Sequence, residues 1–286
     1  MKHLATFLIV LLLSSCASTN RIKLGNETAK KGTEISQKAL DIFDLLSQQT
    51  DIDKSQQDRI NILTNPDPKT MTLPDTKIER FSAQIETRIK AYQSLLNTYK
   101  VFALLTDNPY SVKTQEASSL LLKSYNSIEK LPDLPAQVSS KLPALLEKIT
   151  QAVQAKKIRK HSDVLFNLTQ LYVLLWDEDQ KIWNQYIDVI YDNYVLALNT
   201  VASTKYDSKK IFENSKEPYD EYTAVLLYRL KQREEIVKRK NEIKKQICHF
   251  EKALTELNKI HEELSKSKTN IVDVILMLDS IEKLLK

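Results

Sequence analysis

The distribution of glycine constrains this chain more than any other feature. Both glycines, Gly25 and Gly32, lie near the amino terminus, and residues 33–286 contain none. Glycine supplies the positive backbone angles that tight hairpins, phosphate-binding loops and nucleophile elbows need. Residues 33–286 therefore cannot contain a Walker A loop, a dinucleotide-binding fingerprint or a G-x-S-x-G elbow, and a hairpin-rich sheet is strongly disfavoured.

Helix-forming residues replace glycine in this region, and their pattern predicts an all-α fold. Leu, Lys, Ala, Glu and Gln are abundant, and apolar residues recur at steps of three and four. We expect helices over 32–49, from 76 to 106, over 112–130, from 136 to 204, over 219–265 and from 270 to the end. Pro143 should bend the helical stretch or mark a fresh start, with a further break near His161. The sequence thus predicts an elongated multi-helix bundle.

Two polar connectors are candidate boundaries within this helical domain, which we place at 32–286. The first, 64–75, contains three prolines, and the second is 203–218. The segment 16–31 is polar, so we expect a flexible tether. In the last helix, the spacing predicts one apolar stripe; its members are Ile271, Ile275, Leu278, Ile281 and Leu285.

A local heptad pattern in the 219–265 helix is typical of a coiled coil. We call it the heptad seam, and its members are Ile236, Ile243, Ile247, Phe250, Leu254, Leu257 and Leu264. Side chains this apolar should pack against another helix, which can belong to the same bundle or to a second copy. Cys248 flanks the seam and is expected to be a small packing residue, with an intermolecular disulfide as the alternative.

The first sixteen residues resemble the signal peptide of bacterial lipoproteins. Lys2 gives a basic start, residues 4–13 form an apolar core, and Leu13-Ser14-Ser15-Cys16 is similar to a lipobox. The resemblance implies cleavage after residue 15 and a diacylglyceryl group on the Cys16 thiol. Two alternatives remain, an ordinary signal peptide with a chance cysteine and an uncleaved anchor.

This resemblance also implies a place in the cell. Two or more acyl chains hold a protein stably in a bilayer. Ala17 follows the cysteine where aspartate would favour the inner membrane, so we expect an outer-membrane anchor facing the periplasm, ahead of the inner membrane or the cell surface. The net charge of +5 is mild and interspersed with acids, which argues against a nucleic-acid partner.

No catalytic or metal-binding pattern stands out, and no cofactor is expected. His261 begins a zinc-protease-like stretch, but Ser265 stands where the second histidine must be. Asp188 and Asp192 lie one turn apart as on a solvated helix face, with pairing to the basic 229–245 segment as an alternative. Aromatic residues on the apolar helix faces, such as Trp176, are expected to pack in the core, with ligand binding as the alternative.

These observations lead to one functional hypothesis and two alternatives. We expect a lipid-anchored helical scaffold or adaptor in the cell envelope, without catalysis, which associates with a protein partner or with itself through its helices. The first alternative is a helical module that binds an apolar or aromatic ligand. The second is a surface-displayed lipoprotein that contacts a host or another cell.

Overall fold

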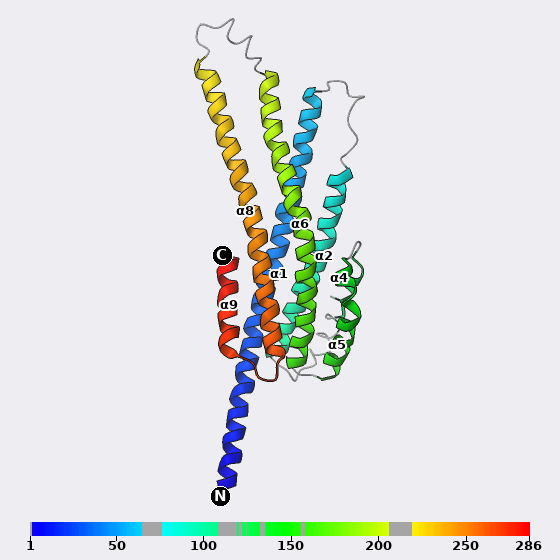
Figure 1. Ribbon diagram of the computed structural model, residues 1–286, viewed down its shortest axis with the longest axis vertical. Coiled ribbons are helices and arrows are strands. Elements are labelled where there is room, and N and C mark those ends of the chain that lie inside the picture. Colours follow the sequence, from blue (N-terminus) through cyan, green and yellow to red (C-terminus); the bar gives the residue numbers. More distant parts are fainter. Residues whose placement is uncertain are drawn as a thin grey trace. The chain divides into compact units, whose positions relative to one another are not determined.

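The predicted fold class is confirmed by the computed structural model, which is all-α and multi-helical (Figure 1). It describes residues 2–64, 76–107, 119, 122–123, 125–131, 135–155, 158–205 and 219–286. The helices there are α1 (Lys2–Thr64), α2 (Thr76–Asp107), α4 (Ala136–Ser139), α5 (Leu142–Ala155), α6 (Ile158–Lys205), α8 (Tyr219–Ser265) and α9 (Ile271–Leu285). Two compact units make up the chain, and their boundaries lie inside helices; the two candidate connectors are largely outside the described residues.

The first unit comprises residues 1–41, 87–178 and 248–286. Its centre is an aromatic cluster whose members are Tyr92, Tyr172, Trp176 and Phe250, contributed by α2, α6 and α8. Ring centroids are 4.0 Å apart for Trp176 and Phe250 and 4.9 Å apart for Tyr92 and Tyr172. The Tyr172 hydroxyl donates a 2.7 Å hydrogen bond to the Ala91 carbonyl, so its polar atom is satisfied inside the core.

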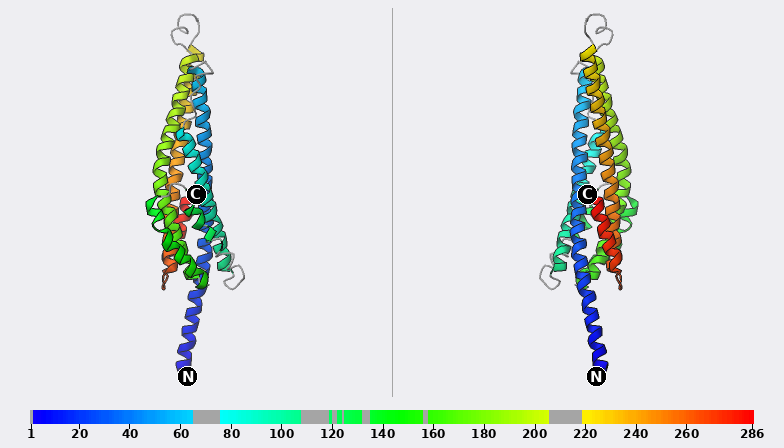
Figure 2. Two further views of the ribbon diagram at one scale, coloured as in Figure 1. Left: turned by 90° about the vertical axis from the view of Figure 1, so that its right-hand side faces the viewer. Right: turned by 90° about the vertical axis from the view of Figure 1, so that its left-hand side faces the viewer.

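The second unit comprises residues 42–86 and 179–247 and takes one stretch each from α1, α2, α6 and α8. Successive helices run in opposite directions, as in an up-down-up-down bundle (Figure 2). Phe43 meets Trp183 edge to face at 5.2 Å, and Phe81 stacks on Tyr186 at 3.9 Å. These aromatic contacts join α1 and α2 to α6.

Helix α1 begins far earlier than the sequence predicts, and the flexible tether expected at 16–31 is wrong. These residues lie within α1, and Leu24, Thr28 and Ala29 are buried. The Thr28 hydroxyl donates to the Leu24 carbonyl at 2.6 Å, which satisfies a buried polar group inside the helix. A stripe of small residues, rather than large apolar ones, faces the core here. The sequence of this part of the helix therefore resembles that of a polar coil.

Gly32 shows why that stripe is small. The ring of Tyr99 on α2 lies so close to the α1 backbone that a Cβ at position 32 would overlap it. The Ser36 hydroxyl, one turn later, donates to the Gly32 carbonyl at 2.7 Å. Glycine therefore serves here as a close-approach residue within a helix and not as a flexible joint.

The first predicted helix ends later than expected, because α1 continues to Thr64 rather than ending near residue 49. The helix expected over 112–130 lies largely outside the described residues, and the other predicted helix ends agree with the structure. Helix α2 ends at Asp107, α8 has the expected bounds, and Asn270 caps α9 by accepting from the Asp273 amide. Pro143 is the second residue of α5, where its missing amide is harmless. The break expected near His161 falls slightly earlier, between α5 and α6.

The apolar stripe predicted for α9 is wrong at its amino-terminal half. Val274, Leu278 and Ile281 are buried, whereas Ile271 and Ile275 are 37% and 45% exposed. Apolar residues surround the first two turns of this helix, so spacing alone could not choose the packed side. The buried stripe is instead set by the three positions that α9 presents to the rest of its unit.

We expect Gly32→Ala to lower the melting temperature of the protein. Overpacking typically costs about 1–3 kcal/mol, which exceeds the gain of about 1 kcal/mol from replacing glycine in a helix. Thermal unfolding followed by circular dichroism measures the effect. The matched control is the same substitution in a Tyr99→Leu background, where the ring is gone; an equal loss in both backgrounds would contradict the close-approach role.

We expect Phe250→Asp to destabilise the protein by at least about 3 kcal/mol, because it removes a buried ring and buries a charge. Denaturant unfolding of the full chain measures this loss. Lys252→Asp, at an exposed position two residues away, should change stability by less than about 0.5 kcal/mol. Similar losses for the two variants would refute the assignment of Phe250 to the core.

Candidate functional site

Cys16, the expected lipid attachment residue, lies in α1, and its side chain is outside the described residues. The first buried side chain after it among those described is Leu24. Eight residues of helix span about 12 Å, so the expected anchor is joined to the first unit by a short helical link. The described part of the chain offers no helix with the length and hydropathy of a membrane span.

The heptad seam is buried inside the chain itself. In the second unit, Ile236, Ile243 and Ile247 are each at most 5% exposed. In the first unit, the corresponding members are Phe250, Leu254, Leu257 and Leu264, each at most 1% exposed. These side chains are thus covered by the chain itself, as expected of a seam that packs against another helix of the same bundle.

His261 lies on the same buried side of α8 and contacts aromatic residues of α2. Its Nε2 is 2.9 Å from the Tyr99 hydroxyl, and its ring lies against Phe102. Burial lowers the pKa of His261 to about 3. A neutral imidazole that forms a structural hydrogen bond fits the expected role in the seam. Among the described residues, no cluster of three or more His, Cys, Asp or Glu side chains could hold a metal ion.

The pairing considered for Asp188 and Asp192 is present in the second unit. Lys240 lies 2.7 Å from Asp188 and 3.6 Å from Asp192, and Lys244 donates to Asp188 at 2.7 Å. Hydrogen bonds from Lys240 and Lys244 lower the pKa of Asp188. These groups are partly exposed, so each pair contributes only about 0–1 kcal/mol and serves mainly to fix the register of α6 against α8.

Cys248 is exposed, so the prediction that it packs beside the seam is wrong. The adjacent Ile247 takes the buried position, and neighbours on a helix point about 100° apart. The thiol is therefore open to solvent. Trp176 and Trp183 are both fully buried. Their burial agrees with the expectation that aromatic residues of the helices pack in the core.

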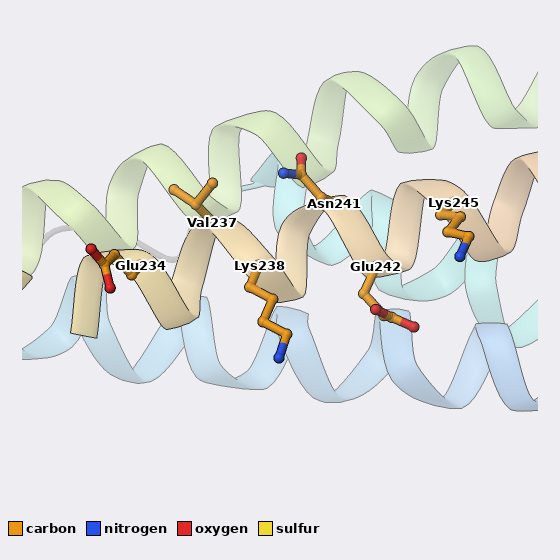
Figure 3. A pocket seen from close by; sticks show the side chains of 6 residues that line it. All are labelled: Glu234, Val237, Lys238, Asn241, Glu242 and Lys245. Carbon is orange, nitrogen blue, oxygen red and sulfur yellow. The ribbon is translucent and has the colours of Figure 1, made fainter. Parts of the chain in front are cut away.

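Two surface hollows are lined mainly by residues with charged or polar side chains. One, of about 450 Å³, is lined by side chains from one exposed face of α8 alone (Figure 3). Its lining includes Glu234, Glu242, Lys238 and Lys245, whose charges cancel. The other, of about 430 Å³, lies in the first unit, and its lining residues are Lys90, Gln93, Ser94, Asn97, Lys123, Asn126, Ser127 and Lys130. Neither lining contains an aromatic side chain.

Sequence reasoning missed an exposed apolar face on α9. Val272 and Leu276 are 63% and 60% exposed, and Ile271 and Ile275 lie beside them. The signal was present, because residues 271–278 are apolar at every position except Asp273. A helix that packs along one stripe cannot bury so many apolar side chains.

We expect acid to destabilise the protein through its two buried histidines. Burial lowers the pKa of His161 to about 4 and that of His261 to about 3, from an ordinary value of 6.5. The unfolded chain therefore binds more protons, so stability is complete above pH 6.5 and falls as the pH drops toward these values. The slope is about 1.4 kcal/mol per pH unit for each histidine.

Unfolding free energies measured between pH 7 and pH 5 test this expectation. His261→Gln should make the loss on acidification clearly shallower, whereas Lys252→Gln, at an exposed position of the same helix, should leave it unchanged. An unaltered slope in His261→Gln would show that this imidazole does not control the acid response.

No family model, curated protein or solved structure matches the chain. Its functional interpretation therefore depends on its own residues. Those residues supply a lipobox-like tetrad, a core that buries most of the aromatic side chains that the structure describes, and an exposed apolar face on α9.

Proposed function

We propose that this chain is a membrane-anchored lipoprotein whose helical bundle acts as a scaffold or adaptor in the cell envelope, without catalysis. The observation that carries the proposal is the Leu13-Ser14-Ser15-Cys16 tetrad with its basic start and apolar run. A thiol bearing two acyl chains would hold the bundle at a bilayer. The most consistent place is the periplasmic face of an outer membrane, given Ala17 after the cysteine.

The helical architecture supports the scaffold part of the proposal. Helix α1 extends from the lipobox into the core. A movement of the anchor would therefore be transmitted directly to the bundle. The aromatic side chains that a ligand-binding module would use, such as Trp176 and Phe250, are packed against each other. The exposed surface of α9 offers an apolar contact face outside the core.

We expect Cys16→Ala to abolish lipid attachment, because the thiol is the acceptor. Cells that express the full chain are fed a clickable palmitate, and the label on the purified protein is measured. Cys248→Ala is the matched control and should keep full label, since Cys248 lies far from the tetrad in sequence. Equal labelling of Cys16→Ala and the unaltered protein would end the lipoprotein proposal.

The same cells test the scaffold part. Chemical crosslinks between the lipidated protein and envelope proteins should weaken in Cys16→Ala, because a scaffold that has lost its anchor leaves the membrane. An unchanged set of crosslinks in the unanchored variant would show that the membrane position plays no part in its contacts.

A further inference from the structure

The exposed face of α9 changes character along its length. Val272, Ile275 and Leu276 are 63%, 45% and 60% exposed. The residues seven positions later, on nearly the same side of the helix, are Asp279, Glu282 and Lys283. The face is thus apolar in its first two turns and charged in the last two. The opposite side of α9 is buried through Val274, Leu278 and Ile281, so this face points away from the core.

The apolar half of α9 lies near the expected anchor. Helices α1 and α9 run in the same direction within the first unit (Figure 1). A hydrogen bond from Lys286 and the nearby charge of Lys31 on α1 lower the pKa of Glu282, so Glu282 lies close to Lys31. Because the two helices run in the same direction, the first turns of α9 lie nearer the level of Cys16 than its last turns do (Figure 1). Counting back eleven residues along both helices puts Ile271 near the level of residue 20, within about two helical turns of Cys16.

We propose that the apolar half of α9 inserts into the interfacial region of the bilayer that holds Cys16. The inference rests on the lipid anchor of the proposed function. The boundary between apolar and charged residues on this face follows distance from the anchor, as a membrane contact requires. Ile271, Val272, Ile275 and Leu276 would lie at the headgroup and acyl boundary, where peripheral helices bury an apolar face about 5–10 Å deep.

The neighbouring residues suit a lipid surface. Lys268, exposed in the turn before α9, can pair with a headgroup phosphate, while Asp279 and Glu282 stay in water. A patch of four side chains would bind a membrane weakly alone. The helical link from Cys16 removes most of the entropy cost of bringing it there, so the anchored protein can keep the contact.

A pair of matched labelling positions tests the insertion. The full-length lipidated protein, with Cys248→Ser to remove the exposed thiol, is reconstituted in vesicles of phosphatidylethanolamine and phosphatidylglycerol. An environment-sensitive dye is attached at Val272→Cys or, as the control on the same face, at Lys283→Cys. Headgroup-attached nitroxide lipids should quench the dye at position 272 at least threefold more than the dye at position 283, with a blue-shifted emission at 272.

The outcomes separate this inference from the proposed function. Equal, water-like quenching at both positions in protein that stays on the vesicles through an acylated Cys16 would overturn the insertion and leave the anchor intact. Protein without acyl chains on Cys16, by mass spectrometry, would overturn both. Shielding of position 272 that vanishes when each vesicle carries a single protein would assign the face to a second copy and also overturn the insertion.

Discussion

The contact between the Tyr99 ring and the α1 backbone at Gly32 determines how the first unit is assembled. Without a side chain at position 32, α2 approaches α1 more closely than any other residue would allow. The same tyrosine extends its hydroxyl to His261 on α8. One residue thus joins three helices, and the spacing it imposes places α2 and α8 where Tyr92 and Phe250 can meet.

The sequence predicts the helices well and their surroundings less well. The bounds of α2 and α8 follow from the periodicity of their apolar residues and from the polar connectors beside them, because helix formation is largely a local property. The heptad seam predicts burial but not the identity of the neighbour, which only the fold supplies. Cys248 was misplaced for a related reason, since a small residue beside a buried stripe can point either way.

The largest discrepancies occur where small or uniformly apolar residues conceal the packed side. Residues 16–31 resemble a coil because Gly25, Thr28 and Ala29 carry little hydrophobic signal, yet they face the core of the first unit. The ring that packs against the next glycine, Gly32, belongs to Tyr99 on a helix distant in sequence, and no local pattern reveals it. In α9 the opposite holds, because apolar residues lie on several sides of the helix. Tertiary packing therefore decides which side is buried, and Val274 lies on that side.

The continuity of α1 also bears on the order of maturation. A peptidase takes its substrate in extended form, so under the lipoprotein proposal the removal of residues 1–15 would require the helix to unwind around position 16. Among the side chains described between the proposed cut and the core, Asn20 and Lys23 are exposed and Ile22 is half-buried, and Leu24 is the first that is buried. Unwinding that stops before Leu24 leaves the described core intact. Under the proposal, processing can then follow folding as readily as precede it.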